Sequence, residues 1–332
     1  MLSRILREPQ ALFRILIGVS VTILLTYLAF RELDLASIQR RMAVIPVFPI
    51  LLCLIGQALL QLFHMLRWGT LLRKLEVVPW LRIYSLNVIG NAALYILPMR
   101  LGEFVRPTLA ASQTQLKFSQ TSSTSVIERA IDGIIIAGLA LVALFSSRSD
   151  SGNEDIFRSA LLLLLIVIFL FTLLFIAVRN TEWILKFIGR TIGQVSSRLS
   201  EILRQFVTQF TQATSKFLTF QTLSLYLGLS LSIWLIDSLS IYALFSILDA
   251  RFPFQATFMA LSLIVLGSFL PSGPGQIGVF EYSVSLGLAV FGMPLEDGIL
   301  IGALYHGILL GTIILLGLSG FTASRFLLSK PQ

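Results

Sequence analysis

Residues 256–291 read ATFMALSLIVLGSFLPSGPGQIGVFEYSVSLGLAVF, and this stretch contains two apolar runs on either side of a segment rich in proline and glycine. Each run has about 13 residues, which corresponds to roughly 20 Å of α-helix. The hydrocarbon core of a bilayer is about 30 Å thick, so neither run crosses it alone. The stretch therefore predicts a re-entrant helical hairpin, whose two short arms meet at residues 270–278, here termed the second break.

An earlier apolar stretch, residues 85–116, has the same plan, because LPMRLGE at residues 97–103 interrupts it. We term these residues the first break. Pro98 and Gly102 interrupt the helix here, as Pro271 and Pro274 do in the second break. Irregular backbone at membrane depth is tolerated only against protein or a water-filled cavity, because lipid offers no hydrogen-bond partners. Both breaks are therefore predicted to lie at a polar site near the middle of the membrane.

The composition is that of a membrane protein, with 56% hydrophobic residues, 13% charged residues and a mean hydropathy of +0.87. Soluble domains have nearer a quarter of their residues charged. The net charge of +8 is explained by Lys and Arg in cytoplasmic loops, and we expect no binding of nucleic acid. Cys53 is the single cysteine, and His64 and His306 are isolated, so we expect packing roles and neither a metal nor a cofactor.

Six apolar runs are candidates for full membrane spans, although the third needs its polar flanks to reach across. They are Phe13–Phe30, Val47–Leu66, Ile131–Phe145, Ala160–Val178, Leu223–Leu248 and Ile299–Leu318. With a cytoplasmic N-terminus and two re-entrant hairpins, 19 of the 25 Lys and Arg residues lie on the cytoplasmic side. This distribution predicts that both termini face the cytoplasm.

The predicted topology makes residues 1–332 one all-α membrane domain built as an inverted repeat. Each half, about 1–147 and 159–320, holds three spans and one hairpin, so the second half is inserted upside down. Superposing Pro98 on Pro271 also brings Val47–Leu66 close to the Leu223–Leu248 span. Paired segments interrupted by glycine and proline are typical of transporter binding sites.

Between the halves, residues 181–217 show apolar residues every three or four positions and basic residues elsewhere. This pattern predicts an amphipathic helix on the cytoplasmic surface. Two interpretations of its basic residues stay open: contact with anionic headgroups, or a connector held by charge. The residues concerned are Arg190, Arg198, Arg204 and Lys216.

Ionisable residues at membrane depth are costly and therefore mark candidate sites. They are Arg100, Glu103 and Arg106 at the first break, Glu128, Arg129 and Asp132 in the third span, Asp237, and Glu281 after the second break. Arginines beside helix N-termini suit an anionic phosphate headgroup, and Gly273, Gly275 and Gly278 allow a ligand to approach the backbone. The alternative is a set of internal ion pairs that lock the hairpins together. Arg67-Trp68 is interpreted as an interfacial anchor at the end of its span.

Three of these motifs, taken in order, resemble the flippase-like membrane domain of lysylphosphatidylglycerol synthases. They are Leu97-Pro98-x-Arg100-x-Gly102-Glu103-x-x-Arg106, Glu128-Arg129-x-x-Asp132 and Pro271-x-Gly273-x-Gly275-x-x-Gly278-x-x-Glu281. The resemblance extends from about Arg67-Trp68 to the end, and it includes stand-alone bacterial and archaeal relatives. It implies an eight-segment fold in the cytoplasmic membrane and transbilayer movement of a modified phospholipid. The aminoacyl-transferase domain of the full synthases is expected to be missing, so their synthase activity is not carried over.

The leading functional hypothesis is a lipid translocase without ATPase, which moves an anionic or modified phospholipid or a polyprenyl-lipid headgroup between the hairpins. One alternative is a transporter for a small polar solute, and another is a non-catalytic membrane partner of a lipid-synthesis enzyme. No catalytic motif is present in the sequence, so we expect no enzyme activity.

Overall fold

The computed structural model describes residues 27, 45–147, 162, 165, 166, 169, 172, 173, 175–248, 251–270 and 272–328, with side chains except at 98–100 and 325–328. Within these ranges every regular element is a helix. The predicted span Phe13–Phe30, apart from residue 27, and 9 of the 19 residues of Ala160–Val178 lie outside the described residues.

Four described helices are long and apolar enough to cross a membrane. They are α4 (Val47–Leu75), α7 (Phe118–Ser146), α11 (Phe220–Leu244, continued by the 3-10 turn η2, Phe245–Ile247) and α14 (Leu295–Leu328). Each contains one of the predicted spans, so these four are confirmed as long apolar helices of a multi-pass membrane protein. Their outward faces carry large apolar side chains such as Leu59, Leu239 and Leu315, the expected surface of a helix in lipid.

Two sets of shorter elements fill the space between the long helices. The first set is α5 (Trp80–Ile96), η1 (Pro98–Phe104) and α6 (Val105–Gln113), and the second is α12 (Gln255–Gly267), η3 (Pro274–Gln276) and α13 (Val279–Ala289). Pro98 and Pro274 open the two 3-10 turns, where a missing backbone N–H costs nothing. The chain can turn after η3 because Gly275 and Gly278 adopt positive φ angles of 75° and 84°.

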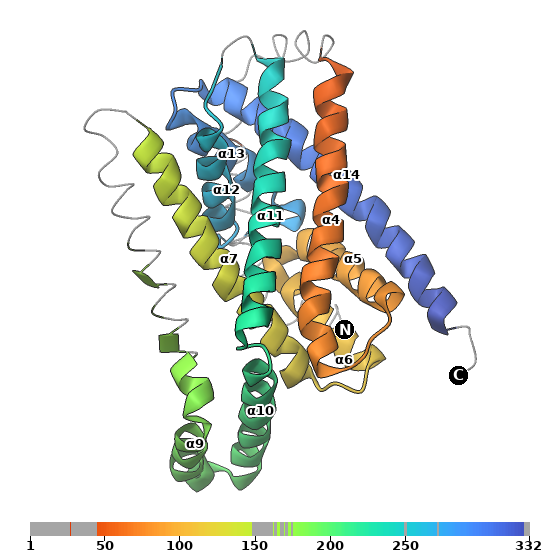
Figure 1. The fold of residues 1–332 in the computed structure, drawn as a ribbon, viewed down its shortest axis with the longest axis vertical. Helices are drawn as coiled ribbons and strands as arrows, with labels where there is room; N and C mark the ends of the chain where they lie inside the picture. Colours follow the sequence, from red (N-terminus) through yellow and green to blue (C-terminus); the bar gives the residue numbers. More distant parts are fainter. Residues whose placement is uncertain are drawn as a thin grey trace.

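Several of the most extensive contacts join helices that are far apart in the sequence. Helix α4 packs against α11, α7 packs against α6 and α12, and α14 packs against α13 and α5. The two 3-10 turns, η1 and η3, contact each other, although they are far apart in the sequence. In Figure 1, α5 and α6 lie toward the end occupied by α9 and α10, whereas α12 and α13 lie toward the opposite end.

Glycine permits the closest of these contacts. A Cβ atom at Gly102 would lie 2.3 Å from the backbone of Ala93, so η1 folds directly onto α5. A Cβ atom at Gly287 would lie 2.5 Å from Cα of Ala260, so α13 approaches α12 backbone to backbone. Small residues allow this approach between membrane helices, where packing is a main source of stability.

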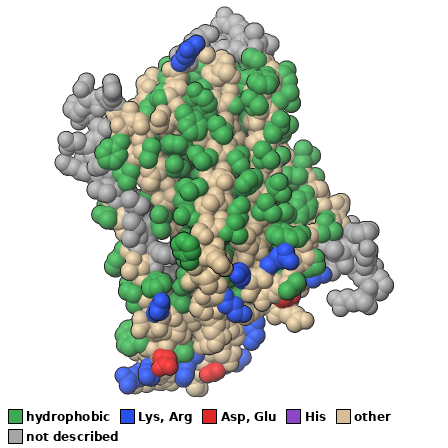
Figure 2. Space-filling model, viewed as in Figure 1, with side chains coloured by type: hydrophobic (Ala, Val, Ile, Leu, Met, Phe, Trp, Pro, Cys, Tyr) green, Lys and Arg blue, Asp and Glu red, His purple; other side chains and the backbone are tan. Residues whose placement is uncertain are grey.

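The amphipathic segment after residue 180 forms two helices, whereas the sequence predicted one. They are α9 (Thr181–Val195) and α10 (Ser197–Ser215), and α10 packs against α9 and α7. The chain breaks at Ser196, whose hydroxyl accepts a hydrogen bond of 3.2 Å from the backbone N–H of Leu199 and so caps α10. On the face shown in Figure 2, most Lys and Arg side chains gather at this end of the molecule.

Candidate functional site

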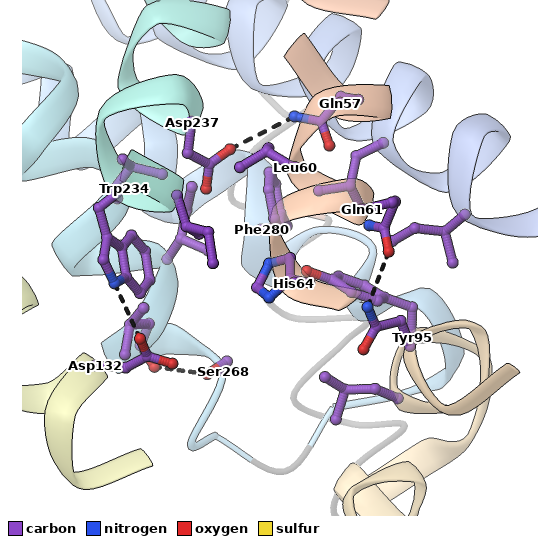
Figure 3. A pocket seen from close by; sticks show the side chains of 18 of the residues that line it. Gln57, Leu60, Gln61, His64, Tyr95, Asp132, Trp234, Asp237, Ser268 and Phe280 are labelled. Atoms are coloured by element: carbon purple, nitrogen blue, oxygen red, sulfur yellow. Dashed lines mark hydrogen bonds between the residues drawn. The ribbon is translucent and has the colours of Figure 1, made fainter. Parts of the chain in front are cut away.

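A central cavity of about 1080 Å³, counted to its open end, lies between the long helices and the breaks. Its polar lining residues come from elements throughout the described chain, and Figure 3 shows several of them pointing toward one another. They are Gln57, Gln61, His64, Arg67, Asn91, Tyr95, Glu128, Arg129, Asp132, Trp234, Asp237, Ser268, Gln276 and Tyr305. A cavity with this many polar groups is the place where ionisable residues at membrane depth are tolerated.

Helix α4 contributes a polar stripe to this cavity. Gln57, Gln61, His64 and Arg67 are spaced by four, three and three residues, which places them on one face of the helix, as Figure 3 shows for the first three. The amide of Asn91 donates a hydrogen bond of 2.8 Å to the side-chain oxygen of Gln61. The rest of α4 is mostly apolar, so this stripe faces the protein interior while the opposite face suits lipid.

Arg67 is the centre of a buried ion network and not the interfacial anchor that the sequence predicted. Only 1% of the accessible surface of Arg67 is exposed. One guanidinium nitrogen lies 2.6 Å from a carboxylate oxygen of Glu128, and the other lies 2.5 Å from one of Asp132. Arg67 also donates to the hydroxyl of Ser230 at 3.1 Å, and its guanidinium lies 5.4 Å from the ring centre of Tyr226. The side chain therefore connects α4 to α7 and α11.

Arg106 extends this network on the other side of Glu128. Its guanidinium forms an ion pair with the second carboxylate oxygen of Glu128 and donates a bond of 3.4 Å to Asn87. It also lies over the ring of Trp68, at 5.1 Å from the ring centre. Arg67, Arg106, Glu128 and Asp132 thus form a neutral cluster of two cations and two anions, as a buried ionic group requires.

Arg129 differs from the other two arginines. It is exposed, and it forms no ion pair or hydrogen bond with another described residue. It lines the central cavity and also a second cavity, here termed the side pocket. The side pocket is lined by Gly90, Asn91, Leu94, Gly102, Glu103, Phe104, Arg106, Pro107, Ser122, Ser125, Val126 and Arg129.

Asp237 also lines the central cavity, three residues after Trp234 on α11. Its carboxylate accepts a hydrogen bond from the hydroxyl of Tyr305 and a long one of 3.5 Å from the amide of Gln57. Figure 3 shows the contact with Gln57 at the edge of the cavity. Asp237 is partly exposed, so the cavity lining carries this carboxylate in addition to the charged residues of α4 and α7.

Glu281 lies just after the second break, where its contacts stabilise the fold. Its carboxylate accepts a hydrogen bond of 2.6 Å from the backbone N–H of Gly278, and its other oxygen lies 2.7 Å from Nδ1 of His306. The imidazole stacks on Phe280, with ring centres 4.1 Å apart. Glu281 therefore caps α13 and fastens it to α14, and it is not among the residues that line the central cavity.

The structure thus groups the candidate residues differently from the sequence interpretation. Glu128, Arg129, Asp132 and Asp237 line the central cavity, while Glu103, Arg106 and Arg129 line the side pocket. Arg100 lies in η1 but its side chain is not described, and Pro271 is outside the described residues. Gly273, Gly275 and Gly278 shape the second break, from which Gln276 reaches the cavity.

Sequence reasoning missed several polar residues that line the cavity, including Gln57, Gln61, Asn91 and Trp234. The indole N–H of Trp234 donates to Asp132 at 3.2 Å. A usable signal was present in the sequence, because Gln57, Gln61 and His64 stand at helical spacing within an otherwise apolar run. Such a stripe in a membrane helix indicates a face that avoids lipid.

Comparison with known proteins agrees with this architecture. The family described as the lysylphosphatidylglycerol synthase TM region matches residues 15–317. A UPF0104 membrane protein of Methanocaldococcus jannaschii is 25% identical over 240 residues, which cover 71% of this chain and 96% of that protein. No solved structure matches the chain. Because the family match spans most of its length, the chain belongs to the family of lysylphosphatidylglycerol synthase transmembrane regions.

Proposed function

We propose that this protein is a lipid translocase that carries an anionic or modified lipid headgroup through the central cavity while the acyl chains stay in the bilayer. The observation that carries the proposal is Arg129, a guanidinium inside a membrane-helix bundle that is exposed to two cavities and lies outside ion-pair distance of the nearby carboxylates of Glu103, Glu128 and Asp132. A charge at this depth is costly, so its retention without a partner points to a ligand. The family supports a lipid as that ligand.

The neighbouring charges make this assignment specific. Arg67 and Arg106 are occupied by Glu128 and Asp132, so these four residues neutralise one another and hold α4, α6 and α7 together. Both terminal guanidinium nitrogens of Arg67 and of Arg106 donate hydrogen bonds within the protein, whereas Arg129 has no acceptor among the described residues. An oxyanion of a headgroup is the ligand that a guanidinium binds best.

We further propose that α5–η1–α6 and α12–η3–α13 are re-entrant hairpins, which together with six full spans form an inverted repeat in the cytoplasmic membrane. Helices α12 and α13, with 13 and 11 residues, reach roughly 20 Å and 16 Å, less than the bilayer core. In Figure 1, the pair α5 and α6 lies toward one end of the bundle and the pair α12 and α13 toward the other. The 3-10 turns η1 and η3, which lie at the two breaks, contact each other. Both observations support hairpins that enter from opposite sides, and the excess of Lys and Arg in the predicted cytoplasmic loops supports termini in the cytoplasm.

The packing pattern supports the repeat as well. If α4 corresponds to α11, α7 to α14 and α5–α6 to α12–α13, then each contact between these eight helices has a counterpart. The contact of α7 with α12 corresponds to that of α14 with α5, and the contact of α6 with α7 to that of α13 with α14. An inverted repeat with its site at the shared interface is the plan of many secondary transporters.

The test is translocation of a fluorescent phosphatidylglycerol across proteoliposomes that contain the purified protein. Val265 lines the central cavity, and its neighbour Leu266 is exposed and does not. Val265→Trp fills the cavity and is expected to reduce the translocation rate at least tenfold, whereas Leu266→Trp on the same helix is expected to retain it. Both variants must show a wild-type melting temperature in detergent.

Two results would count against the proposal. One is a purified wild-type protein that moves no lipid, and the other is a Val265→Trp variant as fast as the wild type. Uptake of a soluble polar molecule without lipid movement would instead favour a solute transporter. Loss of a lipid-synthesis activity on deletion of the gene, with no transport by the purified protein, would favour a non-catalytic partner. The proposal assigns no chemical reaction to the chain.

A further inference from the structure

We infer that the side pocket is a binding site for a single phosphate group, formed by Ser122, Ser125 and Arg129 of α7. The inference rests on the proposed function and names the chemical feature of the lipid that the site recognises. It depends on three observations, which concern the spacing of these residues, their missing partners and the position of the pocket beside the central cavity.

The spacing places the three side chains on one face of α7. Residues 122, 125 and 129 are separated by three and four positions, so they follow one another along the helix over roughly 10 Å. All three line the side pocket, together with Val126, which shares their face. The helix therefore places these three polar residues along one wall of the pocket.

The hydroxyls of Ser122 and Ser125 are buried and have no hydrogen-bond partner. This is unusual, because serine in a helix commonly donates to the carbonyl three or four residues earlier, as Ser123 does to Gln120 at 2.6 Å. A buried hydroxyl without a partner is destabilising, because it has lost its hydrogen bonds to water. A ligand oxygen that accepts from both hydroxyls and from Arg129 would remove this cost.

A phosphate fits these donors better than other headgroup components do. Its oxygens accept several hydrogen bonds at once, and a guanidinium binds two of them in parallel. Glu103 also lines the pocket, from η1, and its carboxylate repels an anion. The phosphate therefore belongs at the α7 wall of the pocket. Asn91, Leu94 and Arg129 line both cavities, so a headgroup held here lies beside the central cavity.

The experiment compares two fluorescent lipids with identical chains in the same proteoliposomes, phosphatidylglycerol and a glucosyl diacylglycerol that contains no phosphate. We expect the wild type to move the phosphate lipid at least tenfold faster. Ser122→Ala with Ser125→Ala is expected to lower the rate for the phosphate lipid about tenfold and to leave the glucosyl lipid unchanged. Ser123→Ala, on the same helix but with its hydroxyl bonded to the backbone, is the matched control.

A third arm measures uptake of radiolabelled inorganic phosphate into the same vesicles. Serine-dependent phosphate uptake without lipid movement would retain the phosphate site and overturn the lipid translocase. Equal movement of both lipids, unaffected by the serine substitutions, would overturn the phosphate site and retain the translocase. If the double variant fails to fold, Arg129→Ala provides the same comparison with Arg129→Lys as the variant that keeps the charge, and wild-type selectivity in Arg129→Ala would overturn the site.

Discussion

Removal of Arg67 tests whether the buried ion network holds the bundle together. In the Arg67→Met variant, Glu128 keeps its ion pair with Arg106, but Asp132 loses both guanidinium contacts and retains the indole N–H of Trp234. The change therefore leaves one buried carboxylate without its counter-ion. Removing one partner of a buried ion pair costs about 3–5 kcal/mol, and this is the loss of unfolding free energy that we expect.

The assay is unfolding by sodium dodecyl sulfate in mixed micelles, followed by circular dichroism. The single variants Arg67→Met and Asp132→Asn are compared with the double variant, in which no uncompensated charge remains. We expect the double variant to be more stable than the sum of the single losses by about 1–3 kcal/mol. Lys74→Met, an exposed position on the same helix, is the control and is expected to change stability by less than about 0.5 kcal/mol.

The reasoning would be refuted by an Arg67→Met variant within about 1 kcal/mol of the wild type, because that outcome is incompatible with an uncompensated buried charge. Strictly additive losses in the double variant would likewise show that Arg67 and Asp132 do not interact. Either result would also weaken the contrast between paired and free arginines on which the function of Arg129 rests.

Further predictions concern the close helix contacts and the second carboxylate of the cavity. Gly287→Ala places a methyl group 2.5 Å from Cα of Ala260, so we expect a loss of about 1–3 kcal/mol in the same unfolding assay. Gly228→Ala places its methyl group in open space on an exposed helix face, so it is expected to be neutral or stabilising by up to about 1 kcal/mol. A loss of stability equal to that of Gly287→Ala would contradict the packing argument. Tyr305→Phe removes the hydroxyl that donates to Asp237 and is expected to cost about 1–3 kcal/mol, whereas no change would mean that this hydrogen bond does not form.

Much of the fold could be predicted because apolar run length and helix breakers act locally. The runs that include Val47–Leu66 and Ile299–Leu318 became α4 and α14, and proline and glycine placed both breaks. The start of α7 could not be predicted in this way, because residues 118–130 are rich in serine and threonine. Their hydroxyls donate to carbonyls within the helix, as Thr124 does to Thr121 at 2.7 Å, so the polar segment remains helical inside the protein.

The ion network was harder to predict, since its partners are distant in sequence. Arg67 and Asp132 are 65 positions apart, and only the packing of α4 on α7 and α11 brings them together. The same sequence position, just after an apolar run, is occupied by interfacial anchors in many membrane helices. What distinguished Arg67 was the polar stripe that leads to it from Gln57, a signal that is visible only when the run is drawn as a helix.

The two hypotheses left open by the sequence, ion pairs or ligand binding, apply to different faces of α7. Glu128 and Asp132 are four positions apart and share a face that is closed by Arg67 and Arg106. Arg129 follows Glu128 directly and so points about 100° away around the helix, toward the face of Ser122 and Ser125. In the proposed function this neighbouring pair has separate roles, because Glu128 joins the network that fixes the helix, whereas Arg129 would bind the ligand. The ion network on the face of Glu128 and Asp132 holds α7 in place. The other face can therefore carry Arg129 outside any ion pair with the described residues, beside a side pocket that remains open.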